Sequence, residues 1–164
     1  MTLSLVAGCS SPASEPVETF TPSSSPSQDE QDASTFQALY ATYIDLPFDE
    51  ESEDDLRSVL TGSALSSDLQ SLESDRQSGR QIVGKDTFRG FVVTDHGLDP
   101  ASGEYMVARV CLDVSGTRVL DAGGADVTPE RDDLLNLQMK AVKVQDQGWR
   151  ISDFVRNDSV HVCG

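Results

Sequence analysis

The sequence predicts an α+β domain in which three helices come first and a strongly curved antiparallel sheet follows, with the helices on one face of the sheet. Two observations predict this order. Up to about residue 77, apolar residues recur at spacings of three and four, as they do in amphipathic helices. From Arg80 onwards they alternate with polar residues, and clusters of turn residues separate the alternating segments, as in an antiparallel meander.

The first predicted helix ends before Pro47, because the residue preceding a proline is disfavoured in helical conformation. Ser34 or Thr35 is expected as its N-cap, since short hydroxyl side chains cap helices well. Its apolar stripe consists of Phe36, Leu39, Tyr40, Tyr43 and Ile44.

Two further helices are predicted between residues 49 and 79. Acidic residues at 49–55 precede Leu56, Val59 and Leu60, and negative charge is favourable at a helix N-terminus. After Gly62, a leucine stripe marks a third helix that runs to about Gln77 and closes at residues 78–79.

Four strands are predicted at residues 88–95, 105–114, 134–144 and 149–155. Turn residues at 99–103 and 146–148 connect neighbouring strands, and a short hairpin is expected to turn at 121–124. In the second strand Met106, Ala108 and Val110 share one face, whereas Arg109 and Cys111 lie on the other. That second face must be exposed to solvent or covered by polar groups.

The segment Leu5-Val6-Ala7-Gly8-Cys9 resembles the lipobox of bacterial lipoproteins, in which small residues precede a cysteine that receives a diacylglyceryl group. The resemblance implies lipidation of Cys9 and stable attachment to a membrane, because two acyl chains suffice for anchoring. The first basic residue is Arg57, and only a short apolar stretch precedes Cys9. We therefore interpret residues 1–9 as the remnant of a lipoprotein signal.

Residues 10–35 are predicted to form a disordered tether. They contain eight Ser, four Pro and five acidic residues but no basic residue. Such a segment cannot bury enough apolar surface to offset the entropy lost on ordering. The folded domain is accordingly expected at residues 36–164, and the alternative is that the first 35 residues are the frayed terminus of an intracellular protein.

Cys111 and Cys163 are the two cysteines outside the lipobox. If the chain is exported, they face an oxidising compartment and can pair as a disulfide. The alternative is that they are two unrelated thiols, one buried in a strand and one near the carboxyl terminus.

The charge of the chain argues against several partners. With 28 acidic and 12 basic residues among 164, the formal net charge is −16. This field repels phosphate, so we expect no binding to nucleic acid and no docking on an anionic bilayer through a basic patch.

A second resemblance concerns the folded domain. The order of elements, together with Gly148-Trp149-Arg150-Ile151 opening the last strand, resembles the cone-shaped fold of the nuclear transport factor 2-like superfamily. Segments 38–40 and 110–115 are similar to those of uncharacterised actinobacterial-type lipoproteins. The superfamily includes isomerases, dehydratases and cyclases with an acid or base inside the cone, and many members without activity. The resemblance also implies that a homodimer can form through the open face of the sheet.

Three residues are candidates for chemistry inside such a cone. Strand alternation places Asp153 on the same face as Trp149 and Ile151, and Tyr40 or Tyr43 could stand opposite. The alternative is that Asp153 lies at the rim in water and the tyrosines only pack.

Motifs for other chemistry are absent from the sequence. The two histidines are far apart, so we expect no metal site, and no cofactor is expected because no dinucleotide or phosphate-binding glycine motif occurs.

These observations predict a lipid-anchored, extracytoplasmic lipoprotein whose domain is a non-catalytic module that binds an unknown protein or small molecule. One alternative is a small enzyme of the isomerase or dehydratase type that uses Asp153 as a base. The other is an intracellular acidic protein without lipidation, in which Cys111 and Cys163 are free thiols.

Overall fold

The computed structural model describes residues 26–47 and 52–164, and it has the predicted order of helices followed by strands. The helices are α1 (Gln28–Ile44), α2 (Glu53–Val59) and α3 (Gly62–Ser78). The strands are β1 (Gln81–Gly84), β2 (Thr87–Asp99), β3 (Gly103–Asp113), β4 (Thr117–Leu120), β5 (Leu134–Val144) and β6 (Gly148–Arg156), and a short 3-10 helix, η1 (Asp158–Val160), follows.

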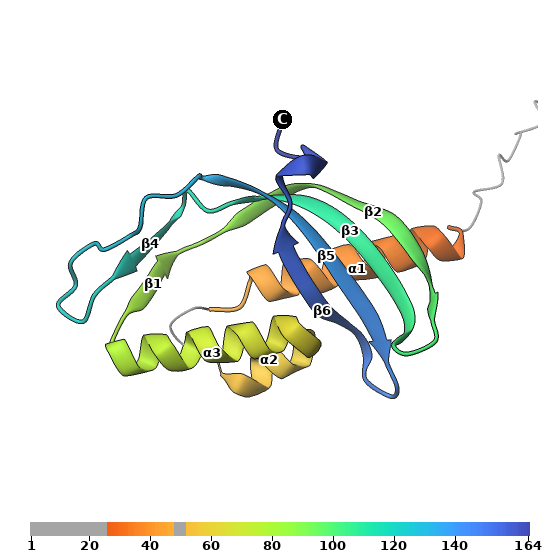
Figure 1. Cartoon of the computed structure of the whole chain (residues 1–164), viewed down its shortest axis with the longest axis horizontal. Helices are drawn as coiled ribbons and strands as arrows, with labels where there is room; N and C mark the ends of the chain where they lie inside the picture. Colours follow the sequence, from red (N-terminus) through yellow and green to blue (C-terminus); the bar gives the residue numbers. More distant parts are fainter. Residues whose placement is uncertain (1–25, 48–51) are drawn as a thin grey trace, which may run out of the picture.

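The strands form two antiparallel sheets. Four strands pair in the order β2-β3-β5-β6, and β1 pairs separately with β4. Figure 1 shows the larger sheet arching over the helices, which all lie on one side of it, while the carboxyl terminus lies on the other side. The α+β class and the three helices are thus confirmed, and the sheets remain open rather than closing on themselves.

The core lies between the helices and the concave face of the larger sheet. Phe36 and Tyr40 on α1 are buried, and their rings contact Phe91 and Phe88 on β2 at centroid distances of 5.3 and 4.9 Å. The alternation predicted for β3 is confirmed, because Met106, Ala108 and Val110 are all buried. The remaining buried core residues are Leu56, Val59, Leu60, Ala64, Met139, Ala141 and Ile151.

Helix α1 begins earlier than the composition predicts. Ser27, rather than Ser34 or Thr35, is the N-cap, and its Oγ accepts from the Glu30 amide at 3.3 Å. The Glu30 carboxylate in turn accepts from the Ser27 amide at 2.7 Å, which completes a capping box. Residues 28–35 are therefore helical, and the predicted tether is wrong over that stretch. Residues 10–25 lie outside the described residues, as does the lipobox.

Strand β6 contains a bulge that reverses its alternation. Asp153 pairs with Lys140 and Ile151 pairs with Ala141, so Ser152 is the extra residue. The chain that links α2 to α3 docks at this point, where the Thr61 amide donates to the Ile151 carbonyl at 2.8 Å. Gly62 is required there, because its φ is +58° and a Cβ would lie 2.8 Å from the Ser152 carbonyl oxygen.

Cys111 and Cys163 form a disulfide, with their Cα atoms 4.9 Å apart. The predicted pairing is confirmed, and the alternative of two unrelated thiols is wrong. The bond fastens the carboxyl-terminal tail to the outer face of the sheet. The side chain of Asn136 on β5 holds the same tail, since its Oδ1 accepts from the amides of Val162 and Cys163 at 2.7 and 2.9 Å.

Candidate functional site

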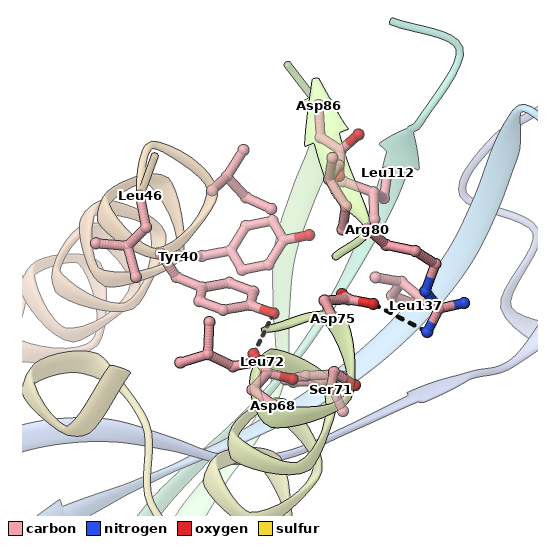
Figure 2. A pocket seen from close by; sticks show the side chains of 14 residues that line it. Tyr40, Leu46, Asp68, Ser71, Leu72, Asp75, Arg80, Asp86, Leu112 and Leu137 are labelled. Carbon is pink, nitrogen blue, oxygen red and sulfur yellow. Dashed lines mark hydrogen bonds and ion pairs between the residues drawn. The ribbon is translucent and has the colours of Figure 1, made fainter. Parts of the chain in front are cut away.

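A cavity of about 240 Å³ lies between α1, α3 and the strands of both sheets. It is smaller than the roughly 300–1,000 Å³ of typical drug-sized ligand pockets, so it suits a small molecule. Figure 2 shows that its wall combines leucine side chains with tyrosine, aspartate and arginine. The apolar part of the wall consists of Ile44, Leu46, Leu72, Ile82, Leu112, Leu137 and Phe154.

Two tyrosines on α1 enter this cavity. Tyr40 and Tyr43 are three residues apart, so they lie on the same face of the helix. The Tyr43 hydroxyl donates to the Asp68 carboxylate on α3 at 2.8 Å. The Tyr40 side chain is 1% exposed, and its hydroxyl has no hydrogen-bond partner in the described part of the chain. Burial, and then the charge of Asp86, raise the pKa of Tyr40 far above its usual range, so this hydroxyl keeps its proton.

Two carboxylates in the wall, those of Asp68 and Asp86, are destabilised in their ionised form by burial. Burial raises the pKa of Asp68, although the hydrogen bond from Tyr43 opposes the rise. Burial also raises the pKa of Asp86, whereas the Thr117 hydroxyl and the charge of Arg131 lower it. Asp86 Oδ1 is buried without a hydrogen-bond partner among the described residues. Carboxylates with raised pKa values in a cavity are typical of functional sites.

The other charges of the wall form an ion pair at its rim. Arg80 Nη2 lies 2.9 Å from Asp75 Oδ1, and the two side chains are 43% and 26% exposed. Figure 2 draws this pair apart from the Asp68 and Asp86 side chains. Arg80 therefore neutralises Asp75, and no other cation of the wall is found within the described residues to pair with Asp68 or Asp86.

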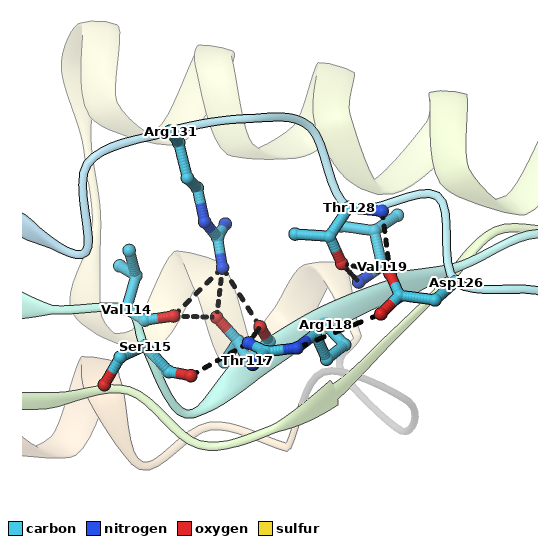
Figure 3. Close-up of polar contacts among 8 residues, drawn as sticks. All are labelled: Val114, Ser115, Thr117, Arg118, Val119, Asp126, Thr128 and Arg131. Carbon is cyan, nitrogen blue, oxygen red and sulfur yellow. Dashed lines mark hydrogen bonds and ion pairs between the residues drawn. The ribbon is translucent and has the colours of Figure 1, made fainter.

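Figure 3 shows a polar network at the corner between β3 and β4, and two of its members, Thr117 and Arg131, lower the pKa of Asp86. Arg131 Nη2 donates to the Val114 carbonyl at 3.0 Å and to the Thr117 hydroxyl at 2.8 Å. Thr117 is only 3% exposed, and its hydroxyl donates to the Val114 carbonyl at 2.9 Å. These bonds hold Thr117 and Arg131 in place beside Asp86.

The inward position of Asp153 is wrong, and the alternative that this side chain lies in water is confirmed. Its side chain is exposed, and Oδ1 accepts from the Ser63 hydroxyl at 2.7 Å instead of facing the tyrosines. The bulge at Ser152 is the cause, because one extra residue moves every later side chain of the strand to the opposite face. Phe154 consequently points inward and its ring lies 5.8 Å from that of Tyr43, whereas Val155 is 47% exposed.

Sequence reasoning placed Tyr40 and Tyr43 at the site but missed Asp68 and Asp86. A signal for Asp68 exists in the sequence, since it lies three residues after Leu65 and four before Leu72, within the apolar stripe of α3. Asp86 lies between β1 and β2, which belong to different sheets, and no local pattern marks it.

Metal binding has no geometric support in residues 26–47 and 52–164. No three His, Cys, Asp or Glu side chains within these ranges are grouped so that they could hold a metal ion.

Comparisons with known proteins show the fold alone. No family model and no curated protein matches the sequence. The crystal structure of the intermembrane space region of chloroplast protein ARC6 is similar at 17% identity and a TM-score of 0.55, covering 80% of this chain and 98% of that one. A periplasmic fragment of TraM matches at 15% identity and a TM-score of 0.49, covering 77% of this chain and 97% of that one. The resemblance to the nuclear transport factor 2-like superfamily stays a prediction.

Proposed function

We propose that this protein is a lipid-anchored, extracytoplasmic lipoprotein whose domain binds a small molecule in the cavity beside Tyr40 without transforming it. The observation that carries the binding role is the pair of buried oxygens, Tyr40 Oη and Asp86 Oδ1, that lack hydrogen-bond partners in the described chain. Each such group lowers the stability of the protein, and a bound ligand would satisfy both. Buried polar groups that lack hydrogen-bond partners, and so lower the stability of the fold, are typical of binding sites.

Two features support the location outside the cytoplasm. The disulfide between Cys111 and Cys163 is of the kind that persists in oxidising compartments. The lipobox at residues 5–9 supplies an anchor at the opposite end of the chain. Within the described residues, no helix is both long and apolar enough to cross a membrane. Because residues 5–9 resemble a lipobox, a diacylglyceryl group on Cys9 is the proposed attachment.

Lipidation is tested by intact-mass analysis of protein expressed with its upstream codons in a bacterium that processes lipoproteins. We expect Cys9 at the mature amino terminus with a diacylglyceryl group, and recovery of the protein in the membrane fraction. A Cys9→Ser variant is expected to leave that fraction. Unmodified Cys9 behind an intact Met1 would contradict the anchor.

Cavity binding is tested by following the methyl signals of Leu72 and Ile82 while a fragment library is added. The variant Ser71→Trp places an indole at the exposed mouth, and Ser67→Trp, on the same helix but outside the cavity wall, is the matched control. We expect fragments that shift these signals in the parent protein and in Ser67→Trp but not in Ser71→Trp. Fragments that bind all three proteins equally would place their site elsewhere.

An enzyme of the isomerase or dehydratase type remains a second candidate. It is favoured by Asp68 and Asp86, since burial raises both pKa values toward the range of a general acid or base. If the domain is such an enzyme, a bound fragment with an acidic C–H bond is expected to exchange that hydrogen for deuterium in deuterated water. Binding without exchange supports the non-catalytic module.

A homodimer through the open face of the sheet also stays a prediction. The side chains of Val92 and Val155 are 52% and 47% exposed at the two edges of that face, which favours contact. Arg109 and Lys140 lie between them, and two copies face to face would bring these like charges together.

A further inference from the structure

We propose that the cavity selects a small amphipathic amine, whose ammonium group binds between Tyr40 and Asp86 and whose apolar body lies against Leu72, Ile82 and Leu112. This inference rests on the proposed function, because it names the class of molecule that the cavity holds.

The charge of the wall favours a cation. Among the described residues, Asp75 has a cation beside it in the wall, namely Arg80 at 2.9 Å, whereas Asp68 and Asp86 have none there. Arg131 acts on Asp86 from outside the cavity, and it is already bonded to the Val114 and Thr117 oxygens. An anionic ligand would meet Asp68 and Asp86 in a region of low dielectric, where repulsion is stronger than in water. A cation beside Tyr40 would compensate the charge of Asp86.

The unsatisfied atoms favour a ligand that donates several hydrogen bonds. Asp86 Oδ1 can only accept when the carboxylate is ionised, and the Tyr40 oxygen accepts as well as donates. An ammonium group has three N–H donors, so it can donate to Tyr40 Oη and to Asp86 Oδ1 at the same time. A neutral carbonyl would accept from Tyr40 and leave Asp86 Oδ1 unsatisfied.

The rest of the wall favours an organic cation over a metal ion. Leu72, Ile82 and Leu112 have no oxygen to offer, whereas hard cations require six or more oxygen ligands. These side chains instead remove the hydrocarbon part of an amine from water, which adds affinity in proportion to the area buried. The predicted ligand therefore has one charged end and one apolar end.

Isothermal titration of the full chain with three probes of similar shape tests the inference. Phenethylamine is a cation, phenethyl alcohol is neutral and hydrocinnamate is an anion. We expect phenethylamine to bind at least about tenfold more tightly than the alcohol, because charge-assisted hydrogen bonds are the stronger ones. Hydrocinnamate is expected not to bind.

The variant Asp86→Asn is expected to reduce phenethylamine affinity by about tenfold and to leave the affinity for the alcohol within about twofold. Glu130→Gln removes one exposed charge outside the cavity and is the matched control, with no change for any probe. Thermal melting of each variant confirms that it is folded.

The outcomes distinguish a failure of amine selectivity from a failure of cavity binding. If the alcohol binds as tightly as the amine, or if Asp86→Asn affects both equally, the selection of amines is overturned while cavity binding stands. If Glu130→Gln weakens amine binding as much as Asp86→Asn, the amine responds to net charge and the inference is also overturned. If no probe and no library fragment binds, both the inference and the binding function are overturned.

Discussion

Replacing Cys163 by serine lowers the free energy of unfolding by about 4 kcal/mol, the largest single effect that we expect. The bond joins residues 52 positions apart, so it removes a large loop-closure entropy from the unfolded chain. Cys111 stays in place in this variant, which matters because its side chain is fully buried and a larger or more polar substitute would disturb β3. Chemical denaturation of the oxidised parent and of Cys163→Ser measures the difference.

Reduction provides the control for this prediction. A reductant is expected to lower the unfolding midpoint of the parent protein to that of Cys163→Ser and to leave the variant unchanged. The tail has a second attachment at Asn136, so hydrogen exchange at the Val162 amide separates tail detachment from the loop effect. Equal midpoints for the oxidised parent and the variant would show that the disulfide adds no stability.

The sequence was most informative where a single period extends over a whole element. The leucine stripe of α3 and the alternation on β3 predicted both elements because each side chain there faces either the core or solvent. The composition does not indicate the start of α1, because a segment rich in serine and acidic residues is typical of a disordered tether. The same residues, Ser27 and Glu30, form the capping box, which is the signal that composition concealed.

The candidate site was less predictable, because non-local features place its charged groups. The bulge at Ser152 depends on docking of the α2–α3 link against β6, and it removes Asp153 from the cavity. Asp86 lines the cavity because β1 pairs with β4 instead of joining the larger sheet. No local sequence pattern predicts this long-range strand pairing. Tyr40 and Tyr43 were found because helical spacing alone puts them on the buried face of α1.

Replacing Asp86 by asparagine is expected to raise the free energy of unfolding at about pH 7, by less than about 1 kcal/mol because the side chain is only partly buried. Asparagine has nearly the same shape as aspartate, but it carries no charge into the partly buried site. We expect this gain in stability because burial destabilises the ionised carboxylate of Asp86 more than Thr117 and Arg131 stabilise it. A stabilising change that abolishes selective amine binding is the behaviour of a functional residue.

The same variant has a pH dependence of defined sign. Because the pKa of Asp86 is raised in the folded protein, the folded state takes up a proton before the unfolded chain does as the pH falls. The parent protein thereby recovers stability relative to Asp86→Asn, and the advantage of asparagine disappears below about pH 4, where the carboxyl group is protonated in both states. Denaturation of the parent, Asp86→Asn and Glu130→Gln across this range measures it. A gain for Glu130→Gln equal to that of Asp86→Asn would assign the effect to the net charge of −16 instead of to burial of one carboxylate.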